Sequence, residues 1–472
     1  MQNVSTRPAR QPEPCTPDAT EWGFEIGSKL LITNARVINE SRIQDADVLI
    51  EGDRIAKIAD SIATPDNADV VDAAGCYLIP GMIDDQVHFR EPGLTHKGDL
   101  ATESAAAAAG GITSFMDMPN VDPQTTTRAA LAEKYELAAN RCVTNYGFYL
   151  GATNRNVEEI KALELDDACG IKAFMGASTG DMLVDDPQAL ELLFEHAPVI
   201  VVTHCEHSPT IWDNEARAKA RYGENVPMSE HPRIRSADAC LMSSQLAVDL
   251  ARRHDALLHV LHLTTAIEMG LFSTAQRSQK KITAEVCVHH LWFDESAYAE
   301  LGTRIKCNPA IKTAEDREAL IAAVIDGRLD VIATDHAPHT ADEKQQSYFK
   351  APAGLPLVQH ALMTLFDLAG DGKISLELLV ERTSHAPAGI FGVKDRGYIR
   401  EGYFADLVLV DANRPFIVKK SNLLSKCGWS PFEGRTFSAT IDTTFVNGQI
   451  VYRAGRLTGC IAGKRLEFVR AR

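Results

Sequence analysis

Five side chains that could hold a metal ion stand at the ends of short apolar runs. His88, Lys172, His204, His262 and Asp335 each lie in or directly after a run rich in Val, Ile, Leu and Ala. Runs of this kind are typical of buried strands. Imidazole nitrogen and carboxylate oxygen suit Zn²⁺ best, with Mn²⁺, Fe²⁺ or Co²⁺ as alternatives. A lone His at a strand end is more often structural, but several such residues converging on one edge predict a metal site.

Two of the candidate positions need a separate chemical argument. Gln86 stands two residues before His88, so in a strand both side chains point to the same face. Lys172 cannot bind a metal as an ammonium group. Burial lowers the pKa of a lysine, and a neutral amine can take up CO₂ to become a carbamate. We therefore treat Lys172 as a hypothetical carbamate ligand, whose anionic oxygens could bridge two ions.

The elements that position these residues alternate along the chain. Eight strand-like runs occupy residues 78–89, 112–119, 144–153, 169–177, 198–206, 256–265, 281–290 and 330–339. Helix candidates lie between most of them, at 103–110, 128–140, 187–196, 237–254 and 314–327. Parallel strands need such long crossovers, and eight repeats close most simply as a (β/α)₈ barrel, an α/β fold of the TIM type. The alternative, a doubly wound open sheet, needs a Gly-rich turn after its first strand, and none is present.

A barrel would bring the candidate ligands together, because barrel active sites form at the carboxyl ends of several strands. We assign the barrel to residues 79–390. Residues 28–78 and 391–472 carry short alternating strands with Gly and Asp at the corners. We expect these two segments to meet as one small composite β-sandwich domain. Residues 1–27 are rich in Pro and lack the apolar core of a secretory signal, so we expect a flexible tail.

Composition excludes several classes of protein. The formal net charge of −16 disfavours nucleic acid and anionic membranes as partners. The sequence contains no run of 18 apolar residues, so it does not predict a membrane-spanning helix. Ten cysteines without a C-x-x-C pair favour free buried thiols in a reducing cytoplasm over a disulfide framework.

Several motifs together resemble one family. They are GMIDDQVHFREPGLTHKGD, MDMPN, GIKAFMGAS, VVTHCE, HVLHLTT, KCNPAIK, ATDHAPHT and SPFEG, in this order from about residue 29 to 460. These motifs resemble those of dihydroorotases in the amidohydrolase superfamily. Hydantoinases and allantoinases are related and share the metal ligands, but HFREPG followed by MPN is more similar to dihydroorotases.

The resemblance implies a role for each matching residue. One or two Zn²⁺ ions would be held by His88, His204, His262, Asp335 and Lys172 as a carbamate, and Asp335 would also carry the catalytic proton. Arg90, Asn120 and His339 would bind a substrate carboxylate. Asn308 would contact the ring amide, and Gly354 would line the pocket with the segment 352–354. Residues 341–350 would form a polar mobile loop over the site. The implied reaction is reversible hydrolysis of the small molecule L-dihydroorotate to N-carbamoyl-L-aspartate, a step in pyrimidine biosynthesis.

One residue departs from the family pattern, which has His-x-His where this chain has Gln86-Val87-His88. Gln86 could coordinate weakly through its oxygen, or one of two metals could be bound weakly. The chain could also be an inactive scaffold for a carbamoyltransferase, although every other functional position is kept. A second alternative is a cyclic-amide hydrolase of the allantoinase or hydantoinase type. We further expect a cytoplasmic homodimer, with a carbamoyltransferase as a candidate partner.

Overall fold

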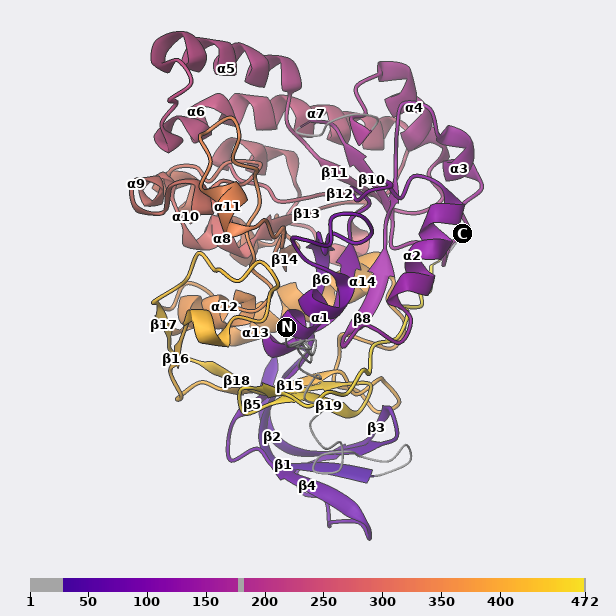
Figure 1. Cartoon of the computed structure of the whole chain (residues 1–472). Coiled ribbons are helices and arrows are strands. Elements are labelled where there is room, and N and C mark those ends of the chain that lie inside the picture. Colours follow the sequence, from indigo (N-terminus) through magenta and orange to yellow (C-terminus); the bar gives the residue numbers. More distant parts are fainter. Residues whose placement is uncertain (1–28, 177–181, 471–472) are drawn as a thin grey trace, which may run out of the picture.

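The computed structural model describes residues 29–176 and 182–470 (Figure 1). The predicted tail, residues 1–27, lies outside the described residues. Nearly the whole described chain forms two parts, a barrel of parallel strands ringed by helices and a β domain below it in the view of Figure 1. None of the helices in these described ranges has the length and the apolar sequence needed to span a bilayer.

The barrel strands pair in two parallel arcs. One arc is β6-β7-β8 and the other runs from β9 to β14. Only Tyr149 separates β8 from β9, and at the other seam the His88 amide donates to the His336 carbonyl at 2.7 Å. The strand bounds are β6 Met82–Val87, β7 Ile112–Asp117, β8 Asn145–Phe148, β9 Leu150–Gly151, β10 Ile171–Phe174, β11 Val201–His204, β12 Leu258–Val260, β13 Ile282–Cys287 and β14 Val331–Ala333. All eight predicted strands are present, so the predicted barrel is confirmed.

Helices cover the outside of the barrel where the crossovers were expected. The five predicted helices are α1 Leu100–Ala109, α2 Arg128–Ala138, α4 Pro187–His196, α7 Ala237–Arg253 and α10 Ala314–Asp326. Asp99, which the sequence left without a role, caps α1 by accepting from the Thr102 amide at 2.9 Å. The remaining helices are α3 Val157–Lys161, α5 Ser208–Tyr222, α6 His231–Ile234, α8 Val288–Trp292, α9 Tyr298–Leu301, α11 Ala341–Lys344, α12 Ala361–Gly370, α13 Leu376–Val380 and α14 Ala386–Phe391.

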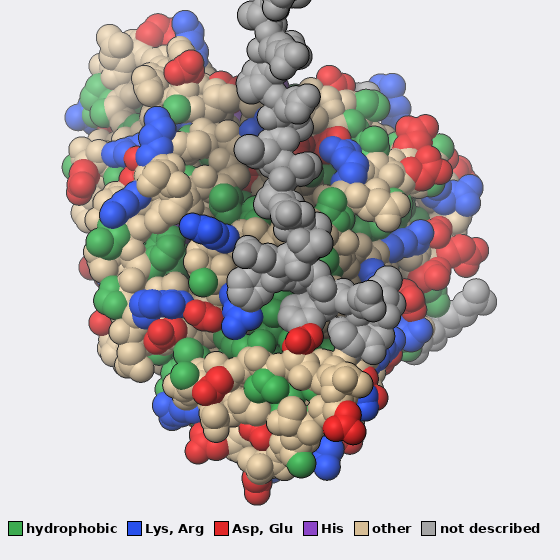
Figure 2. Space-filling model, turned by 60° about the horizontal axis from the view of Figure 1, so that its bottom comes forward, with side chains coloured by type: hydrophobic (Ala, Val, Ile, Leu, Met, Phe, Trp, Pro, Cys, Tyr) green, Lys and Arg blue, Asp and Glu red, His purple; other side chains and the backbone are tan. Residues whose placement is uncertain are grey.

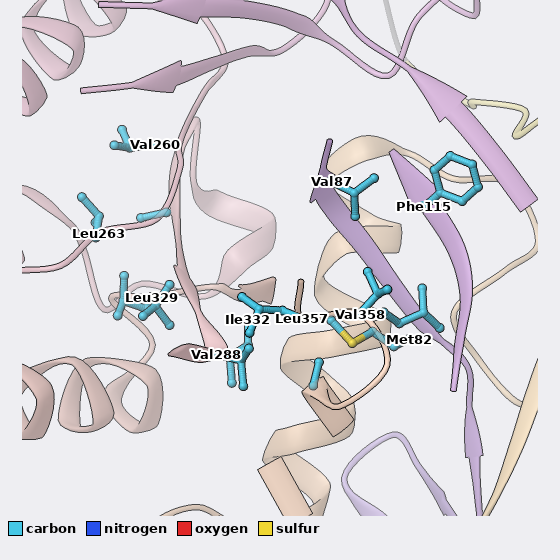
Figure 3. Packing of buried hydrophobic residues seen from close by; sticks show 14 of the residues in the cluster. Met82, Val87, Phe115, Val260, Leu263, Val288, Leu329, Ile332, Leu357 and Val358 are labelled. Carbon is cyan, nitrogen blue, oxygen red and sulfur yellow. The ribbon is translucent and has the colours of Figure 1, made fainter. Parts of the chain in front are cut away.

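Apolar side chains fill the space between the strands and these helices. Figure 3 shows part of this cluster, with Val288, Ile332, Leu357 and Val358 close together on the side of β14. All four are buried, and burial of apolar surface is the main stabilising contribution to such a core. The core therefore fixes the strands whose upper ends carry the candidate ligands.

The composite β domain is one nine-stranded sheet built from both ends of the chain. Its order is β20-β19-β18-β15-β5-β1-β2-β3, with β4 beside β1. The contributing strands are β1 Lys29–Asn39, β2 Arg42–Glu51, β3 Arg54–Ala59, β4 Ala68–Asp72, β5 Tyr77–Pro80, β15 Leu407–Asp411, β18 Thr440–Val446, β19 Gln449–Arg453 and β20 Arg456–Leu457. Both halves share a buried core that includes Ile32, Val48, Leu407 and Phe445. A short pair, β16 Phe416–Ile417 and β17 Thr436–Phe437, lies apart.

The last described residues return to the barrel. Leu466 donates its amide to the Tyr146 carbonyl at 2.8 Å, and Arg470 donates to carbonyls just before β10. Leu466 and Phe468 pack with Ile83 and Val202 inside the barrel. This segment closes the end of the barrel opposite to the candidate site.

The charged side chains on one face of the molecule and the state of the described cysteines bear on the predictions from composition. On the face that Figure 2 shows, Lys and Arg side chains are interspersed with Asp and Glu rather than gathered in one patch. The nine cysteines in the described part of the chain are all free. The expectation of free thiols is confirmed for these residues.

Candidate metal centre and substrate pocket

A pocket with an empty volume of about 480 Å³ opens at the carboxyl ends of the barrel strands. Ten of the residues that the sequence singled out line it: Gln86, His88, Arg90, Asn120, Lys172, His204, His262, Asn308, Asp335 and Gly354. His339 lies beside the pocket, against Arg90. The structure thus brings together every candidate from the sequence.

A bulge in β6 directs its side chains towards the pocket. The pairing of β6 with β7 slips by one residue between Asp84 and Val87, and bulges re-aim side chains in this way. The Gln86 amide donates to Asp335 Oδ1 at 3.2 Å. His88 Nε2 lies 3.1 Å from the same oxygen. Gln86 and His88 both face the pocket, as the spacing predicted.

The proton of His88 can be assigned from its neighbours. Its Nδ1 lies 2.7 Å from Asn120 Oδ1, so Nδ1 carries the proton and donates. Burial lowers the pKa of His88 despite the Asp335 carboxylate, which favours the neutral ring. The lone pair of Nε2 then faces a carboxylate oxygen, and a cation between the two atoms would satisfy both.

A second pair of imidazoles faces the same space. His204 Nδ1 lies 2.8 Å from His262 Nε2. His204 Nε2 donates to Glu206 Oε2 at 2.9 Å, and Arg235 donates to the same oxygen. Burial would raise the pKa of Glu206, but Arg235 and His204 lower it to about 2. Glu206 therefore stays ionised, and His204 turns a lone pair towards His262.

Lys172 lies among the candidate ligands. Its side chain is fully buried, and Nζ has no hydrogen-bond partner among residues 29–176 and 182–470. Lys172 lines the same pocket as His88, His204, His262 and Asp335. Burial lowers the pKa of Lys172 to about 8, so the uncharged amine that a carbamate requires is accessible near neutral pH.

Two of the ligand-bearing segments have left-handed backbone conformations. His262 has φ +40° and Asp335 has φ +49°, which side chains other than glycine rarely adopt. The His262 amide donates to Glu285 at 3.1 Å. Glu285 in turn lies 3.4 Å from His259, which also faces Asp85 at 3.3 Å. This buried group of Asp85, His259 and Glu285 supports the strand tips from below.

Asp84 has a structural role in the strand seam. It accepts from the Thr334 amide at 3.1 Å and from its hydroxyl at 2.6 Å. Burial raises the pKa of Asp84 to about 8. Asp84 thus ties β6 to the end of β14, next to Asp335.

Arg90 places a buried positive charge in the pocket wall. The side chain donates Nε to the Pro338 carbonyl at 3.0 Å, and Arg90 is 6% exposed. Burial lowers its pKa only to about 10, so it is charged at neutral pH. Within the described part of the chain, Arg90 forms no ion pair with a carboxylate at 4 Å or less.

His339 is held neutral beside Arg90. Burial and the charges of Arg90 and Lys97 keep the pKa of His339 far below its ordinary value. Its Nδ1 lies 3.1 Å from Lys97 Nζ, and its Nε2 lies 3.0 Å from Arg90 Nη2 and 2.9 Å from the Ala353 carbonyl oxygen. His339 therefore orients the wall around Arg90.

Two further residues of the pocket lining offer a free acceptor and a close backbone approach. Asn308 Oδ1 is buried without a hydrogen-bond partner among the described residues. Gly354 has φ +139°, and a Cβ atom there would lie 2.4 Å from the Ala337 carbonyl. Only glycine fits this position. Both residues can meet a planar ring.

The segment 341–350 differs from the polar loop that the sequence indicated. It begins as α11 and is anchored by two buried lysines. Lys344 donates to the carbonyls of Lys306, Pro352 and Gly354 at 2.9–3.1 Å. Lys306 donates to the carbonyls of Tyr348 and Ala351. Lysines can satisfy backbone carbonyls with three donors each, which the sequence pattern did not indicate.

These donors fit a metal centre. Neutral imidazoles, a carboxylate and an unpartnered buried amine face one small space, and the lone pairs of His88 and His204 point into it. Sequence reasoning missed Arg235 and Lys97, and it gave Glu206 no role. Glu206 follows His204 by two residues and Lys97 follows Arg90 by seven, whereas Arg235 comes from a distant segment.

Comparison with known proteins agrees with this geometry. The profile of the amidohydrolase family matches residues 77–451. A dihydroorotase of Pediococcus pentosaceus is 33% identical over 431 residues, covering 90% of this chain and 99% of the relative. A dihydroorotase of Halobacterium salinarum is 35% identical over 409 residues, covering 84% and 92%.

Solved structures show the same fold. The L-hydantoinase (dihydropyrimidinase) of Arthrobacter aurescens has a TM-score of 0.88 at 25% identity, with 93% of this chain and 100% of that chain covered. The dihydropyrimidinase of Brevibacillus agri has a TM-score of 0.84 at 27% identity, covering 94% and 100%. The chain belongs to the amidohydrolase family of metal-dependent cyclic-amide hydrolases, and the sequence relatives named above are dihydroorotases.

Proposed function

We propose that this chain is a dihydroorotase, which interconverts L-dihydroorotate and N-carbamoyl-L-aspartate. In hydrolysis, water adds to the ring carbonyl carbon and the C–N bond of the cyclic amide breaks. The nitrogen takes up a proton, and the carbonyl carbon becomes a carboxylate. The sequence relatives at 33–35% identity carry this name.

The buried charge of Arg90 is the observation that carries the proposal. A buried charge is normally paired, yet Arg90 has no carboxylate partner among the described residues. Its planar fork matches the two oxygens of a carboxylate. The substrate of a dihydroorotase brings this anion, whereas the otherwise similar dihydrouracil lacks it.

The residues divide the remaining work. His88, His204, His262, Asp335 and Lys172 as a carbamate would hold Zn²⁺, which acidifies water to a pKa of about 7 and polarises a carbonyl. Burial would raise the pKa of Asp335, but His88 lowers it overall. Asp335 is thus ionised, can accept the proton of the attacking water and can then protonate the leaving nitrogen. Asn308 would accept a hydrogen bond from the ring N–H, while Arg90 orients the carboxylate.

Gln86, in place of the His of the family pattern, is compatible with an active enzyme whose affinity for a metal ion is altered. Its amide nitrogen contacts Asp335 and its oxygen faces Cys287, so its oxygen would have to turn to coordinate. We propose that Gln86 orients Asp335 and binds a metal weakly or not at all. An active homodimer in the cytoplasm remains part of this proposal, as does a role in pyrimidine biosynthesis.

The test compares two cyclic amides on the zinc-loaded protein. We expect ring opening of L-dihydroorotate, and closure of N-carbamoyl-L-aspartate at mildly acidic pH, with dihydrouracil turned over far more slowly. Ultraviolet absorbance of the ring amide follows both reactions. Equal or faster turnover of dihydrouracil would refute the proposal.

A hydantoinase-type activity is the second candidate, because the solved structures named above are hydantoinases or dihydropyrimidinases. It predicts that dihydrouracil is the better substrate. The inactive scaffold for a carbamoyltransferase predicts no turnover of either compound with zinc bound.

A further inference from the structure

A second cluster of metal-ligating side chains lies outside the pocket. Cys287 ends β13, and His289 and His290 lie in the helix α8 that follows. They are 0%, 0% and 3% exposed. One ligand atom of each lies within 4.8 Å of the other two. None of the three lines the pocket that holds the candidate metal centre.

The imidazoles of this cluster have unsatisfied nitrogens. Neither ring nitrogen of His289 has a hydrogen-bond partner among the residues described here, and His290 Nδ1 has none either. Burial lowers the pKa of His289 to about 4, so the ring is neutral. His290 Nε2 donates to the Pro309 carbonyl at 3.2 Å, which leaves Nδ1 with a lone pair. Unpaired buried polar atoms are destabilising and point to a missing partner such as an ion.

The groups around Cys287, His289 and His290 favour a bound cation over an apolar side chain at this position. A carboxylate faces this cluster, because Glu285 Oε1 is among the contacts of Cys287 Sγ, and a positive ion beside it would be stabilised. The contacts of Cys287 Sγ are long, at 3.7 Å to Gln86 Oε1 and 3.8 Å to Glu285 Oε1. The two imidazole rings lie with centroids 4.0 Å apart. Sulfur and nitrogen are the donor types that a borderline-soft divalent ion prefers.

We propose that Cys287, His289 and His290 form a separate Zn²⁺ site beneath the barrel mouth. Two neutral imidazoles and one thiolate supply three ligands, and Gln86 Oε1 lies 3.7 Å from the sulfur. Binding releases the thiol proton of Cys287 to solvent, because only the thiolate is a ligand. The ion would fix the Gln86 carbonyl towards Cys287 and its amide towards Asp335. It would thus position a residue of the pocket without contacting substrate.

The test is X-ray absorption at the zinc edge on the full chain loaded with zinc alone. The proposed catalytic ligands supply only nitrogen and oxygen, so the expected new feature is a sulfur neighbour at about 2.3 Å. The unmodified protein gives this result without any variant. A zinc-saturated protein with no sulfur neighbour would overturn the proposal.

Two variants assign the sulfur. Cys287→Ser should remove the sulfur neighbour and lower the zinc content by one ion per chain. Cys205→Ser is the matched control, because Cys205 is a buried thiol next to His204; it should keep the sulfur signal. Loss of the signal in Cys205→Ser but not in Cys287→Ser would contradict the assignment. If Cys287→Ser does not fold, His289→Gln tests the same zinc content.

The outcome is independent of the proposed function. Dihydroorotate turnover without a sulfur neighbour leaves the dihydroorotase proposal in place and removes this one. A sulfur neighbour without turnover supports this zinc site and removes the dihydroorotase proposal.

Discussion

At the scale of single residues, the pocket is defined by buried groups that the protein itself leaves without a partner. Among the described residues these are the Lys172 amine and the Asn308 oxygen, which make no hydrogen bond, and the Arg90 guanidinium, which has no carboxylate. Leaving such groups unpaired is destabilising unless a ligand satisfies them. Each therefore indicates a different part of the occupant. Lys172, as a carbamate, indicates the metal, Asn308 the ring amide, and Arg90 the carboxylate.

Arg90→Ala should act through the substrate carboxylate. Loss of a buried charge-assisted pair costs about 3–4 kcal/mol, so kcat/KM for dihydroorotate should fall roughly 100- to 1000-fold. Turnover of dihydrouracil, which has no carboxylate, is the control and should change far less. Steady-state kinetics on both compounds measure the difference. An equal loss on both would show that Arg90 only supports the fold.

Glu206→Gln should weaken zinc binding rather than folding. Glu206 accepts a hydrogen bond from His204 Nε2, and loss of such a partner typically weakens metal affinity about 10- to 100-fold. Competition with a chelator measures this affinity. Glu268→Gln is the control, because Glu268 is equally buried but accepts from Ser244 and Thr265. The same loss in both variants would argue against a positioning role.

The sequence predicted the candidate ligands because each lies at the end of a recognisable strand. It could not reveal the Arg235–Glu206 pair, since Arg235 lies 29 positions after Glu206 and has no periodic relation to it. It also could not show that Asp84 bonds Thr334 across 250 positions. Partners of this kind depend on the closed barrel rather than on local pattern.

At the scale of elements, two lysines hold the segment over the pocket. Lys344 is 1% exposed, and burial lowers its pKa to about 7. Burial likewise lowers the pKa of Lys306 to about 8. The unfolded chain then binds more protons than the folded one between pH 7 and 10.5, so these groups make stability rise with pH in that window.

Lys344→Met should remove part of this pH dependence. From pH 7 to pH 9, the shift of Lys344 alone adds about 2 kcal/mol to the free energy of unfolding. Chemical unfolding at the two pH values should show a smaller gain in the variant than in the unmodified protein. Lys350→Met, at an exposed position of the same segment, is the control. An unchanged gain in Lys344→Met would contradict the assigned pKa.

Helices and strands were predictable where the apolar periodicity was strong, and the predictions failed where it was weak. The apolar run at 281–290 predicted one strand, but β13 ends at Cys287 and the chain continues as α8. Helix α5 was not predicted, since few of its fifteen residues are buried and its sequence has little apolar periodicity. Tertiary packing decided both cases.

At the scale of the whole molecule, the first and last described segments support the barrel that carries the site. The N- and C-terminal strands form one sheet, and the segment 464–470 closes the lower end of the barrel. Alternating strands at both ends predicted the shared sheet. The return to the barrel was not predictable, because Leu466 meets Tyr146 across 320 positions without a sequence signal.

Leu466→Ala should destabilise the barrel from below. Leu466 is fully buried, and Leu→Ala changes in cores typically cost about 2–5 kcal/mol. Val469→Ala, at a side chain that is 66% exposed, should change stability by less than about 0.5 kcal/mol. Denaturant unfolding measures both. Similar values for the two variants would show that the segment is not part of the core.

The most direct test of the account is removal and return of zinc with dihydroorotate turnover as the readout. The chelated protein should lose activity, and zinc with bicarbonate should restore it in step with metal content. Lys172→Ala should bind less zinc and stay inactive. Full turnover after complete metal removal, or none at full zinc occupancy, would contradict the claim that these strand ends form a hydrolytic metal centre.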